Sequence, residues 1–92
     1  MVVERLEAVV SGRVQGVGFR FFVEAHALLH SVKGYVKNLP GGDVEVVAEG
    51  GREKLEEFLH ALEKGPPTAK VADVKKNWYA ARGDFKGFSI KY

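Results

Sequence analysis

The stretch KGYVKNLPGGDVEVVA, residues 33–48, contains two runs of strand-forming residues joined by a strong turn signal. Tyr35 and the β-branched residue after it favour a strand over residues 33–39, because such side chains suit an extended chain. Pro40-Gly41-Gly42-Asp43 is built from residue types that dominate turns, and residues 44–48 are again typical of a strand. The stretch therefore predicts a β-hairpin.

A helix is predicted on each side of this hairpin. Upstream, apolar residues recur at helical spacing to about His30, after a segment broken by three glycines. Downstream, apolar residues recur at i, i+3, i+4 and i+7, which indicates an amphipathic helix, and Gly65-Pro66-Pro67 ends it. The residues that carry these patterns are Phe22, Ala25 and Leu29 in the first helix and Leu55, Phe58, Leu59 and Leu62 in the second.

Strands are predicted beyond both helices. Side chains alternate between the two faces over residues 4–11, as in a half-buried strand. Residues 69–79 favour a longer strand, residues 82–84 a turn, and residues 88–92 a short final strand. The order strand, helix, strand, strand, helix, strand is typical of a ferredoxin-like α+β sandwich, βαββαβ, with two helices on one face of an antiparallel sheet.

The composition is that of an ordinary globular protein and predicts one domain over residues 1–92. With no cysteine in the chain, a thiolate nucleophile, a disulfide and a cysteine metal site are all excluded. The longest unbroken apolar run, residues 78–81, is far shorter than the roughly 18 residues of a membrane span. Residues 1–5 lack the apolar region of a signal peptide. We therefore expect a cytoplasmic protein with no membrane partner.

The charge balance gives little support for a nucleic-acid partner. The net charge is +2, and no basic run is longer than Lys75-Lys76. Residues 16–23 are similar to an aromatic motif of RNA-recognition domains, but that motif lies on a third strand, whereas here it leads into a helix. We expect no nucleic-acid partner. An RNA-binding domain is kept as a third interpretation, which would bind single strands in a salt-dependent way.

The loop GRVQGVGFR, residues 12–20, lies between the first strand and the first helix. Free backbone N–H groups and the positive end of the helix dipole meet there, and Gly16 and Gly18 let successive N–H groups face one centre. Arg20 falls in the first helical turn, where a cation opposes the dipole, so a bound anion would explain its position. Two alternatives stay open: the loop is only a turn, and Arg20 pairs with Glu24.

Other catalytic and metal motifs are not supported. The loop lacks the Gly-Lys-Ser/Thr of a P-loop, and its glycines do not fit the dinucleotide fingerprint. His26 and His30 have a spacing that can chelate a metal, but no third ligand is evident, and His60 is expected in solvent. We expect no metal site. Nucleophilic serine catalysis is excluded because no serine lies on a strand-turn-helix elbow; the candidates are Ser11, Ser31 and Ser89.

Three motifs together resemble the acylphosphatase family, over nearly the whole chain. They are GRVQGVGFR at residues 12–20, GYVKNLPGGDVE at residues 34–45 and, as a weaker likeness, GPPTAKV at residues 65–71. Ser31 departs from the family pattern, because a glycine is usual at this left-handed cap of the first helix. The departure is expected to cost about 1 kcal/mol of stability without touching the loop.

The resemblance implies an enzyme that hydrolyses the carboxyl-phosphate anhydride of small acyl phosphates without a metal or other cofactor. It implies that Arg20 binds the phosphoryl group and that Asn38 orients the attacking water. The backbone amides that would complete the phosphate site are those of Gln15, Gly16, Val17, Gly18 and Phe19. Inorganic phosphate and other anions are then expected as inhibitors, and we expect a monomer. The alternative is a non-catalytic module that binds anions or acyl phosphates on the same fold.

The chemistry of Asn38 agrees with this role. Its amide can accept one hydrogen bond from a water molecule and donate others, so it can orient a nucleophile but cannot act as a base. A phosphate oxygen of the substrate is our candidate proton acceptor. The leaving carboxylate has a conjugate-acid pKa of about 4 and departs unprotonated. The alternative for Asn38 is a hairpin-end residue that bonds to nearby backbone.

Overall fold

Seven elements build one five-stranded sheet with two helices, in a computed structural model that describes residues 3–92. They are β1 Val3–Arg13, α1 Phe19–Leu29, β2 Lys33–Asn38, β3 Val44–Gly51, α2 Arg52–Lys64, β4 Lys70–Ala80 and β5 Phe88–Lys91. Residues 1 and 2, part of the segment without a signal-peptide region, lie outside the described residues. Neither α1 nor α2 has the length and apolar character needed to cross a membrane.

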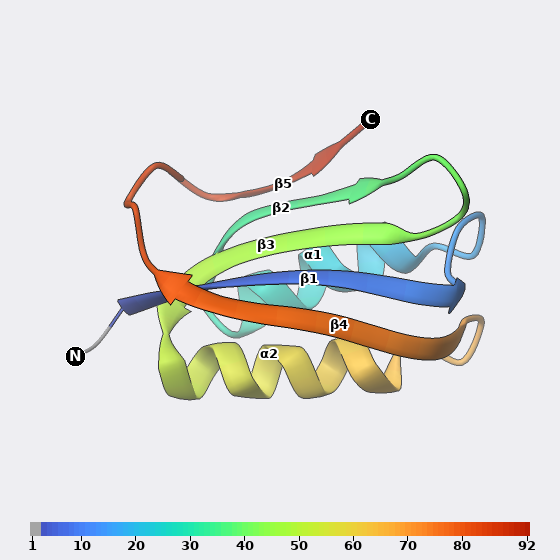
Figure 1. Cartoon of the computed structure of the whole chain (residues 1–92), viewed down its shortest axis with the longest axis horizontal. Helices are drawn as coiled ribbons and strands as arrows, with labels where there is room; N and C mark the ends of the chain where they lie inside the picture. Colours follow the sequence, from blue (N-terminus) through green and yellow to red (C-terminus); the bar gives the residue numbers. More distant parts are fainter. Residues whose placement is uncertain (1–2) are drawn as a thin grey trace.

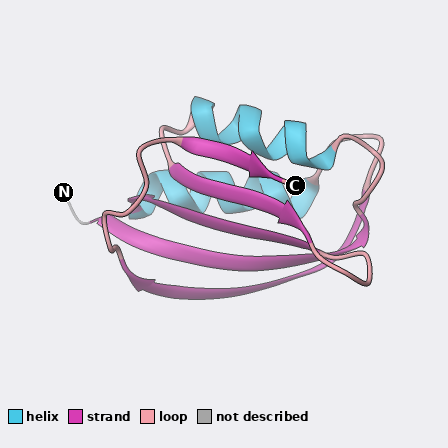
Figure 2. Cartoon of the chain, turned by 90° about the horizontal axis from the view of Figure 1, so that it is seen from above, coloured by secondary structure: helices cyan, strands magenta, loops and turns pink. Residues whose placement is uncertain are grey.

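The strand order in the sheet is β4-β1-β3-β2-β5 (Figure 1). The predicted hairpin is confirmed, because β2 and β3 pair antiparallel from Lys33 opposite Glu49 to Asn38 opposite Val44. β1 lies between β3 and β4 and is antiparallel to both. Both helices pack on the same face of the sheet (Figure 2). The predicted ferredoxin-like α+β fold is therefore confirmed.

The prediction of a wholly antiparallel sheet is wrong at one edge. β5 pairs with β2 in parallel, from Gly34 opposite Phe88 to Lys37 opposite Lys91. β4 ends at the end of the sheet where β2 begins, and residues 81–87 cross that end before the chain turns back beside β2 (Figure 1). The final strand therefore runs in the direction of β2, and the sheet is mixed.

Residues 81–87 also contact the sheet face that the helices leave uncovered. On that face Arg5 of β1 and Glu49 of β3 are buried side by side. The backbone amides of Arg82 and Gly83 donate hydrogen bonds to the Glu49 carboxylate, at 2.9 and 3.0 Å. The Arg5 guanidinium lies over the ring of Phe85, 5.3 Å from its centroid. A buried ion pair thus anchors the segment that leads into β5.

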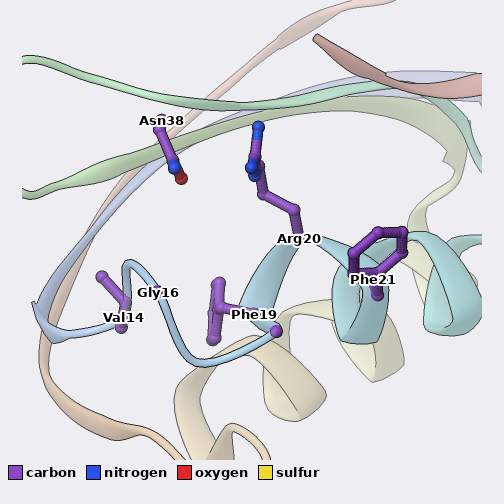
Figure 3. Close-up of a pocket in the computed structure, with 7 residues that line it drawn as sticks. Val14, Gly16, Phe19, Arg20, Phe21 and Asn38 are labelled. Atoms are coloured by element: carbon purple, nitrogen blue, oxygen red, sulfur yellow. The ribbon is translucent and has the colours of Figure 1, made fainter. Parts of the chain in front are cut away.

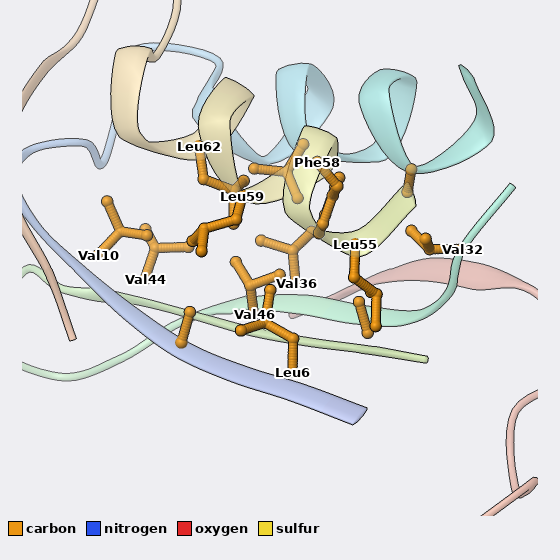
Figure 4. Packing of buried hydrophobic residues seen from close by; sticks show 14 of the residues in the cluster. Leu6, Val10, Val32, Val36, Val44, Val46, Leu55, Phe58, Leu59 and Leu62 are labelled. Atoms are coloured by element: carbon orange, nitrogen blue, oxygen red, sulfur yellow. The ribbon is translucent and has the colours of Figure 1, made fainter. Parts of the chain in front are cut away.

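The hydrophobic core fills the space between the sheet and the helices (Figure 4). The apolar stripe predicted for the second helix is confirmed, because all four of its residues are buried in α2. They pack with the inward residues of the strands and of α1, among them Leu6, Val10, Phe19, Val23, Val36, Val44 and Val46. Because Phe19 is part of this core, the first turn of α1 is held at the end of the sheet.

The C-terminus of α1 is a Schellman motif with a serine in the glycine position. The N–H of Val32 donates to the carbonyl of Ala27, and the N–H of Ser31 donates to that of Leu28. Ser31 has φ 55°, a left-handed conformation that is unfavourable for a residue with a side chain. The left-handed cap expected at the end of the first helix is therefore at Ser31.

Candidate active site

A small cavity of about 80 Å³ lies where the chain passes from β1 into α1 (Figure 3). Its walls come from the loop between these elements, the first turn of α1 and the last residue of β2; the residues are Val14, Gly16, Gly18, Phe19, Arg20, Phe21 and Asn38. The structure therefore brings the two predicted catalytic residues, Arg20 and Asn38, together at the predicted loop. Two other predicted site residues, Gln15 and Val17, do not line the cavity.

The glycine loop, residues 14–18, contains two glycines in the left-handed conformation. Gly16 and Gly18 both have φ 75°, and a side chain at either position would meet no other atom within 4 Å. Their left-handed backbone, and not crowding, is therefore what favours glycine. Gly18 is the N-cap of α1, no side chain caps the helix, and the first turn contains no acidic residue. The positive end of the α1 dipole is thus open to an anion.

Two residues at the end of the sequence, Lys91 of β5 and Tyr92 after it, contact the Arg20 side chain. Nη1 of Arg20 donates a hydrogen bond of 3.4 Å to the carbonyl of Lys91, and the guanidinium carbon lies 4.6 Å from the ring centroid of Tyr92. Within residues 3–92 no carboxylate forms an ion pair with Arg20. The alternative in which Arg20 pairs with Glu24 is therefore wrong. Both observed contacts orient the guanidinium and leave its charge available.

Asn38 points from the end of β2 toward the glycine loop (Figure 3). Its Oδ1 is buried and accepts no hydrogen bond from any described residue. The turn after it is closed by backbone bonds instead, from Leu39 N–H to the Asp43 carbonyl at 2.8 Å and from Gly42 N–H to the Leu39 carbonyl. Asn38 ends the hairpin, but its side chain does not bond to the nearby backbone as the alternative interpretation required. A buried acceptor without a partner costs about 1–3 kcal/mol, so this oxygen is suited to a ligand or water.

Gln15 has a role that the sequence analysis missed. Its side-chain Nε2 donates to the carbonyls of Leu39 and Asp43, each at 2.8 Å. These two bonds tie the glycine loop to the turn that directly follows Asn38. Sequence spacing could not reveal the contact, because the partners meet only when the hairpin packs beside the loop.

The histidines of α1 do not form a metal site. Across the part of the chain that the structure describes, no group of three His, Cys, Asp or Glu side chains could hold a metal ion. The rings of His26 and His30 stack with centroids 5.9 Å apart. Burial and the neighbouring His30 lower the pKa of His26, and Nδ1 of His30 lies 3.4 Å from a carboxylate oxygen of Glu57. His26 and His30 therefore contact each other, and His30 contacts α2 through Glu57. Neither histidine lines the cavity.

Comparison with known proteins gives matches over nearly the whole chain. The family model described as acylphosphatase matches residues 6–90. An acylphosphatase of Thermus thermophilus is 52% identical over 86 residues, which span 94% of this chain and 97% of the relative. One from Bacillus licheniformis is 48% identical over 84 residues, 91% of this chain and 93% of the relative. The crystal structure of an acylphosphatase from Bacillus subtilis matches with a TM-score of 0.93 at 39% identity, over 97% of this chain and 99% of that one. The chain therefore belongs to the acylphosphatase family.

Proposed function

We propose that the protein hydrolyses acyl phosphates in this cavity, with Arg20 and the loop amides binding the phosphoryl group and Asn38 placing the attacking water. The family supports the reaction, and the roles of the residues are our proposal. One observation carries it: Asn38 Oδ1, a buried acceptor without a partner among residues 3–92, shares a small cavity with the Arg20 guanidinium, which pairs with no described carboxylate.

The phosphoryl group would bind where three sources of positive potential converge. The first-turn N–H groups of α1 lack a capping side chain, the two left-handed glycines let loop amides face the cavity, and Arg20 adds a full charge. A guanidinium can contact two phosphate oxygens at once, which fixes the phosphorus atom as well as attracting the anion. The amides that take part in this proposal are those of Gln15, Gly16, Val17, Gly18 and Phe19.

Asn38 would orient the water molecule that attacks phosphorus. Its Oδ1 would accept one hydrogen bond from this water, and the buried oxygen would gain the partner that no described residue provides. Holding a nucleophile at a fixed position can remove several kcal/mol from a barrier by converting a bimolecular step into an effectively unimolecular one. The amide adds no basicity, so its contribution is positional.

The reaction needs neither a general base nor a general acid from the protein. Among the cavity-lining residues Arg20 is the one ionisable side chain, and a guanidinium stays protonated. We propose that a phosphate oxygen of the substrate takes the proton from the water. The bond from phosphorus to the acyl oxygen then breaks, and the leaving carboxylate departs unprotonated because its conjugate acid has a pKa of about 4.

This chemistry restricts the substrates. Alkyl phosphate esters release a strongly basic alkoxide and should react poorly, because the cavity offers no acid to protonate it. Inorganic phosphate and similar anions should compete with the substrate, because the same cation and amides would bind them.

Hydrolysis of benzoyl phosphate with a chelator present tests the proposal. We expect chelator-resistant turnover by the wild type. Arg20→Ala should lose about 100-fold or more in kcat, the scale seen when a charge-stabilising donor is removed. Asn38→Ala should lose about 100-fold, the scale expected when a reacting group is misplaced. Matched controls are Arg82→Ala and Asn77→Ala, which remove an exposed arginine and an exposed asparagine away from the cavity. Both should retain the wild-type rate.

Two other outcomes would overturn the proposal. A wild type that binds inorganic phosphate but turns over no acyl phosphate would be the non-catalytic binding module. A chelator that abolishes turnover would mean that a metal takes part.

We further propose that residues 1–92 act as one domain and as a monomer in the cytoplasm. Arg20, Asn38 and the glycine loop meet within one chain, so the proposed chemistry requires no residue of a second copy. Light scattering at assay concentration tests the monomer, and cell fractionation tests the location.

A further inference from the structure

The third sequence motif, residues 65–71, has no part in the proposed chemistry, but it contacts the glycine loop. Oγ1 of Thr68 donates a hydrogen bond of 2.9 Å to the backbone carbonyl of Val17, 51 positions away in the sequence. Figure 1 shows the turn after α2 and the loop before α1 at the same end of the sheet. The hydroxyl thus reaches the loop from a separate segment of the chain.

We propose that Thr68 is a positioning residue that aims the amide of Gly18 at the phosphoryl group. The Val17 carbonyl and the Gly18 N–H belong to one planar trans peptide, so they point in opposite directions. Because Thr68 holds the carbonyl on its own side, the N–H is turned to the other side of the loop. Gly18 lines the cavity there. The inference rests on the proposed function, in which a phosphoryl group occupies the cavity.

The turn that carries Thr68 is suited to act as an anchor. Pro66 and Pro67 restrict its backbone, since each ring fixes one φ angle. The N–H of Ala69 donates to the carbonyl of Pro66 at 3.0 Å and closes the turn, and Ala69 packs against the hydrophobic core. Thr68 is therefore presented by a segment with little freedom of its own, and little conformational entropy is lost when its hydrogen bond forms.

The glycine loop needs such anchors because its own residues restrain it weakly. Gly16 and Gly18 have no side chain that could fix their backbone. Gln15 fastens the start of the loop to the hairpin turn, and Thr68 fastens its middle. Amides that are held in place before the substrate arrives stabilise developing charge without reorganising, which is the usual source of electrostatic catalysis.

The test compares Thr68→Val, which keeps the shape and removes the donor, with Thr68→Ser, which keeps the donor. We measure the KM for benzoyl phosphate, the inhibition constant of inorganic phosphate, the phosphate affinity by calorimetry, and Tm. Thr68→Val should weaken phosphate binding and raise KM about three- to tenfold, the value of one hydrogen bond. Thr68→Ser should stay within about twofold of the wild type.

Ser11→Ala is the matched control. Oγ of Ser11 also donates to a distant backbone carbonyl, that of Asp73 at 3.4 Å, but on β1 and outside the cavity lining. Its loss should change Tm without changing phosphate affinity, as a merely structural bond would. Should Thr68→Val not fold, Thr68→Ala removes the same donor.

Two results would overturn the inference, and they are distinguishable. If the wild type binds phosphate and Thr68→Val binds it equally well, the inference alone fails. If the wild type binds no phosphate and hydrolyses no acyl phosphate, both the proposed function and the inference fail.

Discussion

Arg5 and Glu49 form a buried ion pair on the sheet face opposite the helices, with Nη1 3.0 Å from Oε2. The two residues are 8% and 6% exposed. Removing one partner leaves the other charge buried, so Glu49→Ala should lower the free energy of unfolding by about 3–5 kcal/mol in urea denaturation. Glu7→Ala is the comparison, because Glu7 also binds Arg5 but its side chain is 36% exposed. It should cost about 1 kcal/mol or less, and equal losses would contradict the argument.

The same carboxylate should make stability sensitive to acid. Burial alone would raise the pKa of Glu49, but the amides of Arg82 and Gly83 and the Arg5 guanidinium lower it overall. A carboxyl group with a lower pKa in the folded state stabilises the fold above its unfolded pKa, about 4.3, and this contribution is lost as the pH falls through the folded pKa. Urea midpoints of the wild type should therefore fall more steeply below about pH 4.3 than those of Glu49→Gln. Parallel curves would show that Glu49 is not responsible.

Ser31→Gly should stabilise the protein. The left-handed conformation costs a residue with a side chain roughly 1–2 kcal/mol, and glycine removes this cost. Glycine also raises the conformational entropy of the unfolded chain, which offsets part of the stabilisation. A net increase of about 0.5–1 kcal/mol in the free energy of unfolding is expected. Ser89→Gly, in the extended strand β5, should destabilise instead. A Ser31→Gly variant that melts at or below the wild-type temperature would exclude strain at this cap.

The rate of hydrolysis should not report an essential enzyme base. The residues that line the cavity include no carboxylate, imidazole, thiol or amine that could act as a base, and Arg20 is their one ionisable member. With a substrate whose ionisation is complete, kcat should be level between about pH 6 and pH 8. A steep rise of kcat with a midpoint near neutrality, in the wild type, would instead indicate a base that acts on the water.

Tyr92 should contribute to substrate binding through Arg20. Its ring lies 4.6 Å from the guanidinium carbon, and an exposed stack of this kind contributes about 0.5–1 kcal/mol. Tyr92→Ala should therefore raise KM about two- to fivefold, whereas Tyr92→Phe keeps the ring and the wild-type KM. Steady-state kinetics decide this, and similar KM values for the two variants would mean that the stack does not position Arg20.

Local signals predicted most of the fold. Each signal comes from residues close together in the sequence. They are the alternation in β1, the apolar stripe of α2 and the turn residues after Asn38. The direction of β5 has no such signal, because it depends on how residues 81–87 cross the end of the sheet. The burial of Arg5 depends on the same crossing. The alternation in β1 places Arg5 on the face away from the helices, which would be exposed to solvent if residues 81–87 did not cover it.

In the candidate site, too, local features could be predicted and contacts between distant segments could not. Arg20 and the glycines could be predicted because a helix N-terminus has a known electrostatic character. The meeting of Arg20 with Asn38 depends on the fold, which brings the start of α1 beside the end of β2. The side-chain bonds of Gln15 and Thr68 could not be predicted, because each joins segments that only tertiary packing brings together.

The position of β1 inside the sheet, between β4 and β3, has a consequence for how the protein is made. β1 leaves the ribosome before β4, one of its two neighbours, in which Ala80 lies opposite Glu4. Until β4 emerges, one edge of β1 has no partner, and an unpaired edge is open to pairing with other chains. The sheet can therefore close only after nearly all of the described chain has been synthesised. Such distant pairings also slow folding in comparison with a helical bundle of similar size.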